Sequence, residues 1–204
     1  MDNHYHLLLQ TLEANLSRAM QWLNVSYTAW FNRRHQRVGH LLQGRFKAVV
    51  VEPETWALGL SRYVHLNPVR VGRLGLSKEH QRAQRQGAGV QASAELLAQR
   101  LRQLRQFRWS SYRAYGGYGP VPPWLEVRTV LGYGGGRQGE RIHRYRAYVE
   151  EAVREGFAEK PWGPDRGQRG ERGRANNAAS RPRWRSKEVG VVVFIDGMCC
   201  AMWI

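Results

Sequence analysis

The first ten residues of the chain alternate in a way that restricts how this segment can fold. Successive side chains of a β-strand point to opposite faces of the sheet, so the pattern predicts a strand with two unlike faces. One face carries His4 and His6, and the other carries Tyr5, Leu7 and Leu9. Two imidazoles on the same face of a strand can bind one metal ion. The segment therefore predicts both a strand and a candidate metal site.

The segments that follow predict a helix, a second strand and a second helix, in that order. Residues 15–32 carry an apolar stripe at helical spacing, and Asn15 suits the cap position. Residues 45–52 contain three consecutive valines, which predicts a largely buried strand. Residues 53–66 begin with a proline suited to the first turn of a helix, and Pro68 stops that helix. This order predicts an α+β fold with a partial ferredoxin-like core, whose helices pack on one face of the sheet.

The chain is strongly basic, which restricts its partners. It has 32 Lys and Arg against 16 Asp and Glu, a formal net charge of +16 over 204 residues. Solubility needs far less charge, so the excess favours a polyanionic partner. Because the arginines stand among aromatic residues and no basic amphipathic helix dominates, we expect nucleic acid and no membrane. The only cysteines, the adjacent Cys199 and Cys200, form no disulfide framework, which fits a reducing cytoplasm.

Six short motifs follow one another between residues 1 and 112. They stand at Met1 to Leu8, Asn15 to Ser17, Phe31 to His35, Gly39 to Ala48, Arg62 to Arg70 and Trp109 to Tyr112. In order and spacing they resemble the motifs of the REP-associated tyrosine transposases, which are single-strand, single-tyrosine transposases of the HUH nuclease superfamily. A lone His-x-His pair is weak evidence, whereas six ordered motifs are specific.

The resemblance implies a tyrosine nucleophile and a metal ion that together cleave single-stranded DNA. Tyr63 would attack the phosphorus, displace the 3′-oxygen and remain joined to the 5′-phosphate. His4 and His6 would bind the metal, and Asn67, four residues after Tyr63, would supply a third ligand. Such nitrogen and oxygen ligands suit Mg²⁺ or Mn²⁺. His65 is an alternative third ligand or a proton carrier.

Seven basic side chains flank this predicted site and would bind DNA phosphates. They are Arg33, Arg34, Arg37, Arg45, Lys47, Arg70 and Arg73. Taken one at a time, each is equally well explained as a solvated surface charge. Trp109, Tyr112 and Tyr115 could stack on unpaired bases, but the favoured interpretation is that they pack a C-terminal helix onto the core.

Composition divides the chain into four parts. Residues 1–76 are predicted to form the catalytic core, and the Gln-, Arg- and Gly-rich residues 77–93 a linker. Residues 94–162 return to helical periodicity and predict a basic helical extension. The Arg/Gly-rich residues 163–204 predict a disordered tail. The transposases that the chain resembles carry a strand and a helix ahead of their His-x-His strand, so we expect a truncated and poorly active copy.

These predictions together describe a transposase. We expect it to nick single-stranded DNA at a hairpin or repeat end and to rejoin strands through a 5′-phosphotyrosine. We also expect a homodimer in the cytoplasm, associated with the nucleoid. One alternative is a non-catalytic protein that keeps the fold and binds structured DNA. Another is a replication initiator of the same superfamily.

Overall fold

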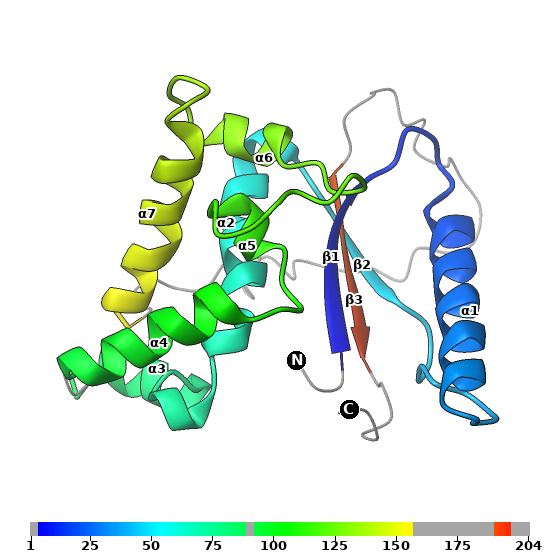
Figure 1. Cartoon of the computed structure of the whole chain (residues 1–204), viewed down its shortest axis with the longest axis horizontal. Helices are drawn as coiled ribbons and strands as arrows, with labels where there is room; N and C mark the ends of the chain where they lie inside the picture. The colour runs from blue at the N-terminus through cyan, green and yellow to red at the C-terminus, as the bar shows by residue number, and fades with distance from the viewer. Residues whose placement is uncertain (1–3, 89–91, 157–189, 197–204) are drawn as a thin grey trace, which may run out of the picture. The chain divides into compact units, whose positions relative to one another are not determined.

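The protein is described by a computed structural model, in which residues 4–88, 92–156 and 190–196 can be placed (Figure 1). These residues form two compact units, the first from Met1–Ala57 and Lys187–Ile204 and the second from Leu58–Ser186. The boundary falls inside the predicted catalytic core of residues 1–76 and inside helix α2 (Pro53–Leu66). The predicted α+β class is confirmed.

The first unit contains a three-stranded antiparallel sheet in the order β1-β3-β2. Strand β1 spans His4–Gln10, β2 spans Lys47–Val51 and β3 spans Gly190–Asp196. Strand β3 runs antiparallel to both neighbours, with His4 opposite Asp196 in the pairing with β1. Strands β1 and β2 therefore run in the same direction on either side of β3.

Helix α1 (Leu16–Arg34) joins β1 to β2 and covers one face of the sheet (Figure 1). Its buried Met20 packs against the β1 side chains Tyr5, Leu7 and Leu9, as alternation along the strand predicts. The Tyr5 hydroxyl also donates a 2.6 Å hydrogen bond to the side-chain oxygen of Asn24 on α1. The predicted two-faced strand and the helix after it are therefore confirmed.

The details of these elements differ from prediction in two places. Asn15 occupies the N-cap position of α1, but in the described part of the chain its side chain makes no capping hydrogen bond. In β2 only Val51 is buried, whereas Val49 and Val50 are exposed, so the prediction of a largely buried strand was wrong. A run of valines favours a strand but does not specify what packs against its faces. Helix α2 has the predicted bounds.

The second unit is helical in its described part. After α2 come two 3₁₀ helices and five α-helices: η1 (Asn67–Val69), η2 (Gly72–Leu74), α3 (Lys78–Arg85), α4 (Ala94–Gln106), α5 (Tyr112–Tyr115), α6 (Arg128–Tyr133) and α7 (Arg141–Arg154). Helix α4 contacts η1, η2, α5 and α7, so it links these elements of the unit. The fully buried Leu60, Leu104, Tyr112 and Val149 belong to its core. No helix in the described residues is long and apolar enough to span a membrane.

The predicted linker at residues 77–93 contains helix α3, so that prediction was wrong for residues 78–85. The Ser77 hydroxyl accepts a hydrogen bond from the backbone N–H of His80 and lies 2.6 Å from the ring nitrogen Nδ1 of the same residue. The buried Gln81 side chain donates a 2.8 Å hydrogen bond to the Leu76 carbonyl. The Ser77 cap and the buried Gln81 amide therefore stabilise α3, although this helix has no large apolar stripe.

The predicted disordered tail at residues 163–204 was wrong for residues 190–196, which form the central strand β3. The apolar run from Val191 to Ile195 is typical of a strand with neighbours on both sides. The prediction missed this run because it rested on the composition of the whole segment, in which the preceding arginines and glycines dominate. Residues 163–189 and 197–204 lie outside the described residues, so for them disorder stays a prediction.

Candidate functional site

Two histidines stand side by side on strand β1. The ring centroids of His4 and His6 lie 5.1 Å apart with an interplanar angle of 44°, which confirms that they share one face. Tyr5, Leu7 and Leu9 point to α1, so the histidines occupy the face of β1 away from that helix. Two adjacent imidazoles of this kind can share a divalent cation.

A metal site needs further ligands beyond this pair. Among the described residues, no group of three or more His, Cys, Asp and Glu side chains is placed to bind a metal. The amide that the resemblance implies, Asn67, belongs to the second unit, whereas His4 and His6 belong to the first. Two imidazole nitrogens and one amide oxygen form a donor set that suits Mg²⁺ or Mn²⁺. The three-ligand site stays a prediction.

Tyr63 lies on α2 in the second unit, and its side chain is half-buried. The guanidinium carbon of Arg70 lies 4.5 Å from the centre of the Tyr63 ring, in a cation–π arrangement. This contact brings Tyr63, near the start of the Arg62 to Arg70 motif, together with Arg70 at its end. Arg70 was predicted to bind phosphate, and its position beside the predicted nucleophile suits that role.

Asn67 does not continue the α-helix that carries Tyr63. Helix α2 ends at Leu66, and Asn67 begins the 3₁₀ helix η1, as the following proline favours. Asn67 therefore lies in a 3₁₀ turn directly after α2, and its role as a ligand stays a prediction. The side-chain nitrogen of Asn67 is buried and has no hydrogen-bond partner among the described residues. This amide nitrogen is a hydrogen-bond donor, so it could contact an acceptor such as a phosphate oxygen, whereas a metal ion would need the side-chain oxygen of Asn67.

His65 is buried inside the second unit, with 3% of its surface exposed. Its Nδ1 lies 2.7 Å from the Tyr145 hydroxyl, and its Nε2 lies 2.8 Å from the Ser111 hydroxyl. Burial lowers the pKa of His65 to about 3, so the ring is neutral at physiological pH. Because both ring nitrogens are occupied by protein groups, the structure argues against the predicted role of His65 as metal ligand or proton carrier.

The Trp109 to Tyr112 motif packs against this histidine. The rings of Tyr112 and Tyr115 lie 5.6 Å and 4.9 Å from the His65 ring, and both tyrosines are buried. The packing interpretation is thus confirmed for these two residues. Trp109 instead has 64% of its surface exposed, and the Arg108 guanidinium lies over its ring.

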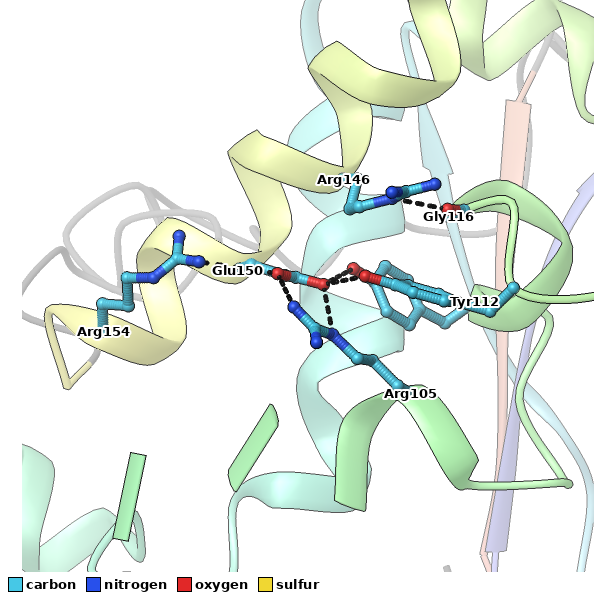
Figure 2. Close-up of polar contacts among 7 residues, drawn as sticks. Arg105, Tyr112, Gly116, Arg146, Glu150 and Arg154 are labelled. Atoms are coloured by element: carbon cyan, nitrogen blue, oxygen red, sulfur yellow. Dashed lines mark hydrogen bonds and ion pairs between the residues drawn. The ribbon is translucent and has the colours of Figure 1, made fainter. Parts of the chain in front are cut away.

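Sequence reasoning missed a second buried polar cluster, around Glu150 on α7 (Figure 2). Arg105 donates two hydrogen bonds to the Glu150 carboxylate, of 2.8 Å and 2.5 Å. The hydroxyls of Tyr118 and Tyr112 donate to the same carboxylate, at 2.5 Å and 3.3 Å. Burial raises the pKa of Glu150, but the hydrogen bonds from Arg105 and Tyr118 outweigh it, so the pKa is lowered. The cluster joins α4 to α7, and no local pattern in the sequence pairs these residues.

The seven predicted phosphate-binding residues divide between the two units. Arg33 and Arg34 are exposed in the last turn of α1. Lys47 is exposed at the start of β2, and Arg45 is exposed two residues before it. Arg37 is half-buried, and its guanidinium carbon lies 5.9 Å from the centre of the Phe31 ring. Arg70 and Arg73 belong to the second unit. No acidic residue occurs between Glu13 and Glu52, so this part of the first unit is strongly positive.

No protein-family model matches the chain, and neither a curated protein nor a solved structure shows significant similarity to it.

Proposed function

We propose that the protein is a metal-dependent tyrosine transposase that nicks single-stranded or hairpin DNA and transfers the cleaved strand. The observation that carries the proposal is the pair of imidazole rings 5.1 Å apart on one face of β1. It is the arrangement that the N-terminal motif predicts, and the five other motifs follow it in order. The basic stretch between Glu13 and Glu52 supports DNA as the partner.

The topology of the first unit supports a ferredoxin-like core. Strands β1 and β2 run in the same direction, helix α1 connects them, and the antiparallel β3 lies between them. This is the split β-α-β arrangement from which ferredoxin-like sheets are built. In the proposed enzyme this sheet presents His4 and His6 on the face away from α1.

The proposed reaction exchanges one phosphate ester for another. The Tyr63 hydroxyl gives up its proton, its oxygen bonds to phosphorus, and the bond from phosphorus to the 3′-oxygen breaks. The released 3′-oxygen takes up a proton, and the 5′ end stays attached to Tyr63. A free 3′-hydroxyl then attacks this phosphotyrosine and restores Tyr63. No nucleotide cofactor is consumed, because each step makes one ester as it breaks another.

Other side chains would bind the metal ion and the scissile phosphate. His4, His6 and Asn67 would hold Mg²⁺ or Mn²⁺, which when bound would offset negative charge on the phosphoryl oxygens. Arg70, beside the Tyr63 ring, would bind an oxygen of the scissile phosphate. As in the transposases that the chain resembles, we propose that it acts as a homodimer, and we place it in the cytoplasm, on the nucleoid.

A nicking assay on single-stranded hairpin DNA with Mn²⁺ tests the proposal. The wild-type protein should remain covalently attached to a 5′ end on a denaturing gel, and Tyr63→Phe should abolish this adduct. Tyr148→Phe is a matched control, because Arg62 lies over the Tyr148 ring as Arg70 lies over Tyr63. An adduct that persists in Tyr63→Phe would disprove the assignment of the nucleophile.

The second candidate function is a non-catalytic protein that binds structured DNA. It rests on the basic stretch between Glu13 and Glu52, which suits DNA binding whether or not a strand is cleaved. The same assay separates the two candidates. A protein that shifts hairpin DNA in a native gel but never forms a covalent adduct, with Mn²⁺ or Mg²⁺, would be the non-catalytic binder.

A further inference from the structure

Helix α1 carries an unusual set of side chains on the side that faces away from the sheet. Each residue of an α-helix turns by about 100° relative to the one before, so residues three or four apart share a side. Such spacing places five residues on one stripe, opposite the buried Met20 and Phe31: Arg18, Trp22, Val25, Ala29 and Arg33. Trp30 flanks this stripe, about 60° round the helix from Arg33, and its ring lies 5.8 Å from the Tyr27 ring.

The large side chains of this outer stripe are open to solvent. Trp22 has 71% of its surface exposed, Val25 62% and Trp30 57%. Single exposed apolar residues are normal in proteins, but several gathered on one helix side indicate an interaction surface. The buried side of this helix is formed instead by Met20 and Phe31, whose side chains are almost completely buried. The outer stripe is therefore available to a partner.

Charge restricts what that partner can be. Arg18 and Arg33 lie in the stripe, Arg34 follows, and no acidic residue occurs between Glu13 and Glu52. A second copy docked through the same stripe would bring like charges together, which opposes association. A membrane-binding helix keeps its basic residues on the side opposite its apolar face, whereas here arginines and tryptophans share one side. The stripe thus fits a polyanion that also offers flat apolar groups.

We propose that the outer stripe of α1 binds single-stranded DNA, with unpaired bases stacked on Trp22 and Trp30 and with phosphates on Arg18 and Arg33. Unpaired strands bind where aromatic side chains and basic residues alternate along a surface. The two indoles are separated by eight residues, or about 12 Å along the helix axis. The choice of DNA over RNA rests on the proposed function. This surface goes beyond that function, because it needs neither the metal nor Tyr63.

The test is binding of a fluorescently labelled oligo-dT strand to the full chain in EDTA, measured by anisotropy at fixed salt. Trp22→Ala and Trp30→Ala should each weaken binding about 5- to 150-fold, the range found for removing one stacked base contact. Trp22→Phe should keep most of the affinity. Trp124→Ala is the matched control, because Trp124 lies in the second unit and has 79% of its surface exposed. It should bind oligo-dT as the wild type does.

Several results would overturn the inference. Wild-type affinity in both Trp22→Ala and Trp30→Ala would do so, as would an equal loss in Trp124→Ala. Equally tight binding of a matching duplex would show that unpaired bases are not what the stripe recognises. A Trp22-dependent change in oligomeric state by light scattering, or Trp22-dependent binding of phosphatidylserine vesicles without oligo-dT binding, would assign the stripe to another partner. Because EDTA prevents cleavage, loss of the nicking reaction alone leaves this inference intact.

Discussion

The Nε2 nitrogen of His65 lies 2.8 Å from the hydroxyl of Ser111, so two motifs that are 46 residues apart share a hydrogen bond. The other ring nitrogen reaches the Tyr145 hydroxyl on α7, which in turn lies 2.6 Å from the Ser61 hydroxyl on α2. These hydrogen bonds hold the buried side of α2, the helix that carries Tyr63, to Ser111 and to α7. A nucleophile must be held in line with the phosphorus it attacks, and a buried polar network can provide this rigidity.

Replacing His65 should therefore destabilise the protein. His65→Ala leaves a cavity and removes the partner of the buried Tyr145 hydroxyl and of the half-buried Ser111 hydroxyl. We expect the free energy of unfolding to fall by about 2–5 kcal/mol, measured by urea denaturation at neutral pH. His143→Ala, which removes an exposed histidine of the same unit, should change it by less than about 0.5 kcal/mol. Equal effects of the two substitutions would show that the network does not stabilise the fold.

The same histidine should make the protein sensitive to acid. The pKa of His65 is lowered to about 3 by burial, whereas an unfolded chain has a histidine pKa of about 6.5. The unfolded state therefore binds the proton more tightly, so stability is complete above pH 6.5 and declines as the pH falls toward 3. The decline contributed by His65 should reach about 1.4 kcal/mol per pH unit below pH 6.

Urea denaturation at pH 7 and pH 5 measures this contribution. His65→Gln cannot titrate, so its loss of stability between the two pH values should be smaller than that of the wild type. The difference isolates His65 from the carboxyl groups, which both proteins share. If the two proteins lose equal stability, the histidine is not held neutral by burial.

The Glu150 cluster should stabilise the second unit through its charge. Glu150→Gln keeps the shape of the side chain but weakens the contacts with Arg105 and Tyr118 (Figure 2). Because the Arg105 side chain remains 38% exposed, we expect a moderate loss of about 1–3 kcal/mol in thermal or urea unfolding. Glu151→Gln changes the exposed neighbour on the same helix and should be nearly neutral. A neutral Glu150→Gln would mean that shape alone holds α4 to α7.

Short sequence patterns predicted those helices and strands that depend mainly on neighbouring residues. Alternation between residues 4 and 10 predicted both faces of β1, and Pro53 with Pro68 predicted the bounds of α2. The pairing of His4 and His6 follows from the period of a strand, so it too was predictable. The position of Asn67 was not, because the choice between an α-helix and a 3₁₀ helix after Leu66 depends on its surroundings.

Long-range relationships were beyond such patterns. Strand β3 is separated from β2 by more than a hundred residues of sequence, and pairing at that distance leaves no periodic signal. Nothing in the sequence names Tyr145 and Ser111 as partners of His65, since the hydrogen bonds arise only when α2, α5 and α7 pack together.

Binding of DNA should depend on salt through the exposed arginines of the first unit. Each contact with a single-stranded phosphate contributes about 0.7 to the slope of log affinity against log salt. The double substitution of Arg33 and Arg34 by glutamine should therefore reduce the slope by about 1.4, measured by anisotropy with oligo-dT. Arg102→Gln, on the exposed side of α4, should leave the slope unchanged. An unaltered slope in the double variant would exclude these two arginines from the interface.

The histidine pair on β1 should be needed for cleavage and not for DNA binding. His4→Ala or His6→Ala removes one of two imidazoles whose centroids lie 5.1 Å apart, so the bound Mn²⁺ loses a ligand. We expect the covalent adduct on hairpin DNA to disappear, while affinity for oligo-dT in EDTA changes less than about twofold. Titration of the protein with Mn²⁺, followed by electron paramagnetic resonance of the free ion, should show weaker binding in either variant. His143→Ala should retain the adduct and the Mn²⁺ affinity of the wild type. Cleavage by the wild type that continues unchanged in EDTA would exclude a metal from the reaction, and these histidines would then need another role.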